Sequence, residues 1–247
     1  MIKLFRRIRR KLVGEGNLPV RQADLKRYLI YAIGEVLLVM IGILLALQVN
    51  NWNNESARKT KELSILTEMN RNLELNVKQF SAEIEHQDSI IQNINIILDH
   101  IKNNIPNHDS LSSKYASIAW SEEFNTANSA FETLKAIGLD LISSDSLREN
   151  IIHLFNVRYL KISDVISKIS SADYTILSQV YLRHIEYDIQ GNGMVNDFER
   201  LKKDREFTNL LSNRRIWKVD IINAYKELIE ESLQLSRMID QELERRT

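Results

Sequence analysis

An almost uncharged run near the N-terminus constrains the fold more than any other feature of this sequence. Residues 28–49 read YLIYAIGEVLLVMIGILLALQV, 22 residues in which Glu35 is the only charged side chain. An α-helix rises about 1.5 Å per residue, so a helix of this length crosses the roughly 30 Å hydrocarbon core of a bilayer. The run therefore predicts a transmembrane helix, which we place at residues 28–50.

Two alternatives for this run are a buried helix of a soluble protein and a cleaved signal peptide. A buried helix is seldom apolar on every side over such a length beside a block of basic residues. A signal peptide has an apolar region of about 7–15 residues that ends at a small-x-small cleavage site, whereas this run continues into Leu-Gln-Val-Asn-Asn. Tyr28 and Tyr31 at one end and Trp52 at the other suit the two membrane interfaces. We therefore expect a retained membrane span.

Charge is segregated along the chain. The whole sequence balances 33 basic against 33 acidic residues. Residues 1–27 nevertheless carry nine basic and two acidic side chains, whereas residues 52–247 carry 24 basic and 30 acidic ones. Basic residues near a span favour its cytoplasmic side. The N-terminus is therefore expected in the cytoplasm, and everything after the span outside it.

The basic cytoplasmic segment, residues 1–27, has a possible role besides setting topology. The stretch MIKLFRRIRRKLV places apolar side chains on one helical face with basic residues around them, as in helices that lie on an anionic leaflet. Beside a span, we expect the partner to be the lipid bilayer and not nucleic acid. The residues expected to set topology or contact lipid headgroups are Arg6, Arg7, Arg9, Arg10, Lys11, Lys26 and Arg27.

Two polar residues, Glu35 and Gln48, lie inside the predicted span. An ionised carboxylate in hydrocarbon is costly unless it finds a partner or water. Glu35 lies about two turns from the cytoplasmic end, so protonation, access to the interface or pairing with a base such as Arg27 would each satisfy it. The alternative is contact between copies of the helix, helped by the small residues Gly42 and Ala46. Ion transport is disfavoured, because a single carboxylate on one span offers no pathway.

The rest of the chain, residues 51–247, is predicted to be an extracytoplasmic helical domain. Seven Gly and two Pro are too few turn residues for an all-β sandwich or barrel, and the absence of Cys excludes disulfides and thiolate sites. Apolar residues recur at steps of three and four, with coiled-coil-like spacing, over 66–101, 155–180 and 217–239. These patterns predict an all-α fold: one N-terminal transmembrane helix followed by an elongated antiparallel helical bundle of long amphipathic helices.

Turn residues divide this domain. Asn103–Ser113 includes a proline and predicts the first clear loop. Gly138 suits the C-cap of a short helix, and a helical pattern resumes after Ser144. The sequence Gly191-Asn192-Gly193 is expected to turn the chain again. Because no Gly or Pro lies between the span and the first loop, the span either continues into the domain as one helix or breaks at the run NNWNN, residues 50–54.

No set of residues predicts catalysis or metal binding. Glu83 and His86 have the Glu-x-x-His spacing of a di-iron helix, but the required second copy is missing, because Glu149 and His153 are four residues apart. The sequence has no phosphate-binding loop, no Gly-x-Ser-x-Gly and no nucleotide fingerprint. We therefore expect no catalytic residue, no metal ligand and no cofactor, and the protein is not predicted to be an enzyme.

Three polar residues interrupt the apolar stripes of the long helices. They are Gln87 in the first stripe, Asp173 in the second and Ser232 in the third. Asp173 and Ser232 could mark a polar ligand pocket within the domain. The alternative is that they set the register of the helices or are partly exposed.

Two long segments resemble a known family. They are MIKLFRRIRRKL with KRYLIYAIGEVLLVMIGILLALQVNNWN, and SAFETLKAIGLDLISSDSLRENIIHLFN. On these motifs the chain resembles a family of N-terminally anchored single-span membrane proteins of Gram-negative bacteria, a domain of unknown function. The resemblance implies a bacterial inner-membrane setting and a periplasmic C-terminal domain, and it carries over no catalytic residue. It also implies a shared anchor design at Gly34, Glu35, Gln48, Asn50, Asn51 and Trp52.

The function expected from these features is that of a bitopic inner-membrane protein. Its periplasmic helical bundle would act as a protein-interaction or assembly module, binding its own copies or another envelope protein. The alternative is a ligand-sensing bundle that signals through the single span. Such a sensor would need an output partner, because 27 cytoplasmic residues leave no room for a kinase or similar domain.

Overall fold

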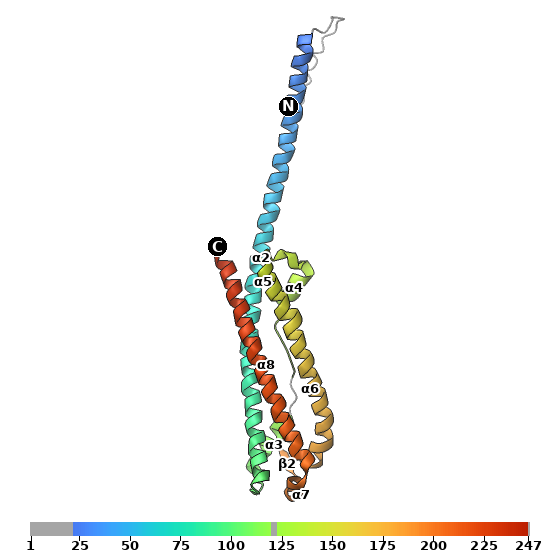
Figure 1. The fold of residues 1–247 in the computed structure, drawn as a ribbon, viewed down its shortest axis with the longest axis vertical. Helices are drawn as coiled ribbons and strands as arrows, with labels where there is room; N and C mark the ends of the chain where they lie inside the picture. The colour runs from blue at the N-terminus through green and yellow to red at the C-terminus, as the bar shows by residue number, and fades with distance from the viewer. Residues whose placement is uncertain (1–21, 120–122, 247) are drawn as a thin grey trace. The chain divides into compact units, whose positions relative to one another are not determined.

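The computed structural model describes residues 22–119 and 123–246, without the side chains of 22–27, 173, 177 and 178. Most of the described residues are helical (Figure 1), so the all-α prediction is confirmed. The chain divides into two units, Met1–Ala57 and Arg58–Thr247.

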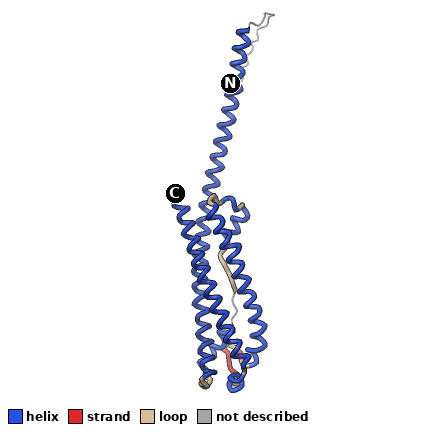
Figure 2. Tube along the Cα trace, in the orientation of Figure 1, coloured by secondary structure: helices blue, strands red, loops and turns tan. Residues whose placement is uncertain are grey.

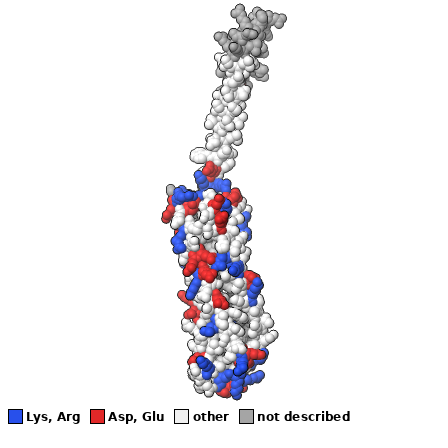
Figure 3. Space-filling model, viewed as in Figure 1, with Lys and Arg blue, Asp and Glu red and all other residues white. Residues whose placement is uncertain are grey.

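Helix α2 is a single uninterrupted helix, Gln22–Lys102. It passes through residues 50–54, so the continuous helix is the arrangement observed. Within the first unit, the side chains of residues 28–49 are exposed except for a half-buried Ala32. An 18-residue window of this helix has a mean hydropathy of 2.5, and among the described residues it is the one helix long and apolar enough to cross a membrane. The face of this stretch drawn in Figure 3 is white, whereas Arg58–Thr247 carries acidic and basic side chains together.

The second unit contains the C-terminal part of α2 and two further long helices, α6 (Tyr159–Val180) and α8 (Arg205–Glu244). Its short helices are η1 (Asp109–Leu111), α3 (Ser112–Ile118), α4 (Ser129–Ile137), η2 (Leu139–Leu141), α5 (Asp145–Ile152), the π-helical turn η3 (His153–Arg158), η4 (Tyr181–Arg183) and α7 (Phe198–Lys203). The predicted boundaries at Gly138 and Ser144 are confirmed, because Gly138 is the C-cap of α4 and the Ser144 hydroxyl caps α5.

Polar contacts give the directions of the long helices. Asn70 on α2 donates to Asp240 on α8 at 2.6 Å, and Glu62, two turns earlier on α2, pairs with Arg246 at the far end of α8. These two helices are therefore antiparallel. Arg158, just before α6, pairs with Glu231 on α8, whereas Arg183, just after α6, pairs with Glu206. Helix α6 is thus also antiparallel to α8 and runs in the same direction as α2.

Two parallel helices need a return connection, and the segment between α3 and α4 supplies it. Ser117 on α3 accepts a hydrogen bond from Asn93, whereas Ala127 in the following loop is hydrogen-bonded to Asn76. Asn93 and Asn76 are 17 residues apart on α2, about 26 Å at 1.5 Å per residue. The chain therefore returns along α2 between α3 and α4, and residues 123–128 of this connection form a loop (Figure 2). The helical patterns of the sequence did not predict this return connection.

Two buried asparagines on α2 hold the return segment. Asn76 accepts from the Ala127 backbone N–H at 2.6 Å and donates to the Ala127 carbonyl at 3.0 Å. Asn72 accepts from the Ala130 N–H at 3.0 Å, at the start of α4. The loop before α4 has no helix or strand hydrogen bonds for its backbone. The side-chain amides of the two asparagines therefore satisfy backbone groups that would otherwise be buried without hydrogen bonds.

The predicted turn at Gly191–Gly193 belongs to a small antiparallel hairpin of β1 (Ile185–Tyr187) and β2 (Gly193–Val195). Gly191 has a φ of 81°, which favours glycine. A Cβ on Gly193 would lie 2.8 Å from the Cβ of Tyr115, so glycine also allows β2 to pack against α3. The strands were not predicted, because each is only three residues long and their glycine-flanked sequence suggested a plain loop.

The buried apolar residues form two clusters along the long helices. One includes Ile65 to Phe80 on α2 and Ile221 to Ile239 on α8; the other includes Ile90 to Ile97 on α2 and Phe207 to Leu211 on α8. In the stretches between the clusters, 81–89 of α2 and 212–220 of α8, the fully buried residues are all polar. On each helix the two clusters are therefore separated by buried polar residues, Gln87 on α2 and Arg214 and Lys218 on α8.

We predict that Asn76→Ala destabilises the second unit by about 2 kcal/mol. The substitution removes both hydrogen bonds to the Ala127 backbone and leaves buried groups unsatisfied. Urea unfolding of the full chain in detergent, followed by circular dichroism, measures the effect. Asn95→Ala, at an exposed position of the same helix, is the matched control and should change stability by less than about 0.5 kcal/mol. Equal stabilities for the two variants would contradict the anchoring role of Asn76.

Candidate functional site

The residues predicted at the membrane interfaces are exposed on α2. Tyr28, Tyr31 and Trp52 are 60%, 75% and 72% exposed, and the predicted intramembrane residues Glu35 and Gln48 are exposed as well. Exposure is compatible with lipid contact without testing it, so these roles stay predictions.

The predicted headgroup residues Arg6, Arg7, Arg9, Arg10 and Lys11 lie outside the described residues. Lys26 and Arg27 belong to α2, but their side chains are also outside the described part of the chain. Their expected contacts with lipid therefore stay predictions too.

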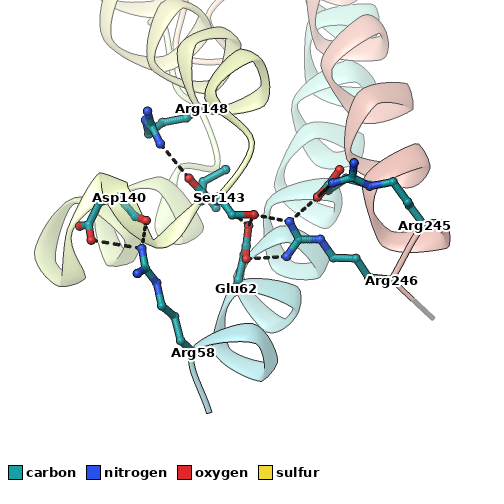
Figure 4. Close-up of polar contacts among 9 residues, drawn as sticks. Arg58, Glu62, Asp140, Ser143, Arg148, Arg245 and Arg246 are labelled. Carbon is teal, nitrogen blue, oxygen red and sulfur yellow. Dashed lines mark hydrogen bonds and ion pairs between the residues drawn. The ribbon is translucent and has the colours of Figure 1, made fainter. Parts of the chain in front are cut away.

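A buried carboxylate, Glu62, joins three segments at one end of the second unit (Figure 4). Its side chain is 3% exposed. One oxygen, Oε1, accepts from the backbone N–H of Ser143 at 2.8 Å and from the Ser143 hydroxyl at 3.1 Å. The other oxygen accepts from Arg246 Nη1 at 2.6 Å. Glu62 thus connects α2 with the loop before α5 and with the residues that follow α8.

Arg246 completes this arrangement, which we call the Glu62 clamp. Its second terminal nitrogen contacts both Glu242 and the Ser143 hydroxyl. Two carboxylates with hydrogen bonds raise the pKa of the guanidinium against the opposing effect of burial. Charge-assisted hydrogen bonds of this kind are roughly twice as strong as neutral ones. The clamp therefore holds the last residues of the described chain against α2.

The loop that reaches the clamp is itself held by arginines (Figure 4). Arg58, one turn before Glu62, donates to the backbone carbonyl and the carboxylate of Asp140. Arg148 donates to the Ile142 carbonyl at 2.9 Å and pairs with Asp145 at 2.5 Å. The Arg58 and Asp140 side chains are mostly exposed, so that pair contributes little. The clamp residues were not predicted, because their sequence positions are up to 184 residues apart.

We predict that Glu62→Gln destabilises the second unit by about 2–3 kcal/mol. It removes one of the two buried carboxylates that pair with the partly buried guanidinium of Arg246, which is more costly than losing an exposed ion pair. The measurement is urea unfolding of the full chain in detergent. Glu74→Gln, at an exposed position of the same helix, should leave the transition unchanged. If both variants unfolded like the unmodified chain, the clamp would have no role in holding the three segments together.

Buried polar residues lie between the two apolar clusters on both long helices. They are Gln87 of α2, which is 0% exposed, and Arg214 and Lys218 of α8, which are 1% and 2% exposed. Burial lowers the pKa of Lys218 to about 8, although the carboxylate of Glu83 acts in the opposite direction. Both amide atoms of Gln87 lack a hydrogen-bond partner within the structure. Gln87 was noted in the sequence as a polar interruption, whereas the two cations were not singled out.

The other polar interruptions have different outcomes. Ser232 is fully buried, and its hydroxyl lies 3.1 Å from that of Tyr159, which in turn accepts from Asn76 at 3.2 Å. Ser232 therefore belongs to the network that holds the return segment, which favours the structural alternative over a ligand pocket. The side chain of Asp173 lies outside the described residues.

A buried histidine links the hairpin to the start of α8. His184 Nε2 lies 2.7 Å from Asp204 Oδ2, and the other oxygen of Asp204 accepts from the Glu206 and Phe207 N–H groups as the N-cap of α8. The hydrogen bond from His184 and the bonds from the helix N–H groups lower the pKa of Asp204. This pair has the geometry of a structural cap, with no further ligand group beside it among the described residues.

We predict that Asp204→Asn destabilises the chain by about 1 kcal/mol at pH 7 and by less at pH 3. Because the folded pKa of Asp204 is lowered, its contribution is present above the unfolded value of about 3.9 and is lost as the pH falls. Thermal unfolding of both proteins at pH 7 and pH 3 measures the difference. Asp220→Asn, at an exposed site on α8, is the control. A stability difference that stayed the same at both pH values would contradict this explanation.

No group of three or more metal-ligating side chains comes together among the described residues. Glu83, half of the Glu-x-x-His pair noted in the sequence, is half-buried and acts electrostatically on Lys218, while His86 is exposed.

No family model, curated protein or solved structure matches this chain. The resemblance to single-span proteins of Gram-negative bacteria therefore stays a prediction from the residues that carry it.

Proposed function

We propose that this chain is a bitopic protein of a bacterial inner membrane whose periplasmic helical domain is a protein-interaction or assembly module. In this proposal residues 1–27 are cytoplasmic, residues 28–50 span the bilayer, and residues 51–247 form an elongated, mostly antiparallel bundle with coiled-coil-like packing outside it. The biological process served by the assembly is not part of the proposal.

The membrane anchor is supported by the surface of α2. Its residues 28–49 are exposed and almost all apolar, and water would oppose leaving so long an apolar helix uncovered. The same helix continues into the second unit, where Leu66, Met69 and Leu73 are buried in the core. One helix therefore belongs both to the anchor and to the domain.

The observation that carries the interaction role is a set of exposed apolar residues around the hairpin. Leu182, Tyr187 and Met194 are 51%, 41% and 48% exposed, and Ile189 in the turn is fully exposed. Tyr187 and Met194 lie on opposite faces of the hairpin, because Tyr187 pairs with Gly193 and Met194 with Glu186. Exposed apolar side chains on both faces and in the turn are typical of a segment that docks on another protein. We assign this surface to a second copy of the chain, with another envelope protein as the alternative.

We predict that the Ile189→Cys variant labels from the periplasm and forms a crosslinked dimer. The chain has no native cysteine, so one introduced thiol reports on one position. A membrane-impermeant maleimide tests the side of the membrane in spheroplasts, and a short bismaleimide tests association in membranes. Glu74→Cys, at an exposed position away from the hairpin, should label equally but not crosslink.

Failure to label either cysteine from the periplasmic side would overturn the proposed topology. A crosslink from Ile189→Cys to a different protein would support the alternative partner. If neither cysteine gave any adduct above the background of the cysteine-free chain, the interaction role would lose its basis.

A second candidate function is a sensor that signals through the span. The buried residue Gln87 favours it, because its amide lies inside the helical domain without a hydrogen-bond partner. Gln87 is on α2, the helix that also contains the predicted span.

A further inference from the structure

A π-helical turn lies between α5 and α6. Helix α5, the turn η3 and α6 follow one another without a break from Asp145 to Val180 (Figure 1). At the end of η3 the Tyr159 N–H donates to the carbonyl of Leu154, five residues earlier and not four as in an α-helix. Such turns are rare, occur mostly as single turns inside α-helices, and are frequent at functional sites. The turn therefore needs a physical explanation.

The buried residues on the two sides of the turn supply that explanation. Both sides contribute to the same apolar cluster, with Leu147, Ile151 and Leu154 on one side and Tyr159, Ile162 and Ile166 on the other. In an uninterrupted α-helix, which rotates by about 100° per residue, the two sets would point in directions about 90° apart. This difference is close to the rotation that a single residue adds. A π-turn accommodates one extra residue, so it brings both sets onto one face of the helix.

Polar contacts hold the chain on both sides of the turn. Two residues before α5, Ser143 donates from its backbone and its hydroxyl to Glu62 of the clamp. At the end of η3, the side chain of Arg158 is 16% exposed and donates to Glu231 and to Glu227, each at 2.7 Å. A straight α-helix would turn Arg158 away from α8 if α5 kept its present position. The π-turn therefore allows both sets of contacts to form at once.

We propose that η3 is a conformational joint, a one-residue insertion that lets α5 and α6 take different rotations about the helix axis. The ion pairs of Arg158 fix the extra residue in η3. Without these pairs the extra residue moves into the next turns of α6, and the hydroxyl of Tyr159 turns away from Asn76 and Ser232. The joint thus connects the Glu62 clamp with the network that holds the return segment. This proposal is independent of the interaction role of the hairpin and of the predicted span.

We predict that deletion of Asn156, an exposed residue of η3, leaves the full chain in detergent at least as stable as the unmodified chain. The deletion removes the extra residue, so α5 and α6 join as one α-helix with both buried sets on one face. Deletion of Asp220, an exposed residue of α8, is the matched control and should lower the unfolding temperature by about 10 °C or more, because α8 has no extra residue to lose. Thermal unfolding followed by circular dichroism measures both. Equal losses for the two deletions would overturn the insertion and with it the joint.

Hydrogen exchange of the backbone amides tests the movement of the extra residue. Arg158→Met should raise the exchange rates of η3 and the first turn of α6 by about tenfold in the otherwise unmodified chain. In the chain that lacks Asn156, the same substitution should leave these rates nearly unchanged, because no extra residue remains to move. Lys168→Met, which removes an exposed ion pair with Asp164 on α6, should have no effect on η3 in either chain. Equal increases for Arg158→Met in both chains would show that Arg158 only fastens the helix to α8, and would overturn the joint.

Discussion

The structure depends on one helix whose surface changes along its length. Helix α2 is almost wholly apolar over residues 28–49 and becomes amphipathic beyond residue 60, with a single stripe facing a protein core. In the proposed topology the first pattern suits a bilayer, because hydrocarbon requires every side of a helix to be apolar, and the second suits a domain in water. No Gly or Pro interrupts the change from one pattern to the other. The rest of the second unit is arranged around the second half of this helix.

The connections of the second unit follow from that arrangement. Because α6 runs in the same direction as α2, the chain must return between them, and Asn72 and Asn76 hold the end of this return at Ala127 and Ala130. This return also brings the loop before α5 to the start of the second unit. There Glu62 accepts hydrogen bonds from the backbone of Ser143 in that loop and from Arg246. Polar side chains of α2 thus hold both the loop before α4 and the loop before α5. The apolar stripe supplies the general driving force, and these few polar groups select which segments lie against it.

The polar groups of the domain have two kinds of environment. Those of the Glu62 clamp and of the Asn76 network have complementary partners at hydrogen-bond distance, so they are explained by the fold. Gln87 is equally buried but has no partner for either amide atom. Natural cores rarely retain such a group without a reason. This contrast separates Gln87 from the networks to which we assign a structural role.

The long helices, the all-α class and the candidate span could be predicted from the sequence, because hydrophobic periodicity and the length of an apolar run are local properties that the chain carries regardless of its partners. The caps at Gly138 and Ser144 were predictable for the same reason. The sequence could not show that α6 is parallel to α2, that Glu62 meets Arg246, or that Gln87 is buried without a hydrogen-bond partner. Those relations join residues far apart in the chain, and only the packing of the helices brings them together. The sequence alone therefore determined the elements and the expected membrane topology, whereas the tertiary structure decided which polar residues are partners and which one is left without any.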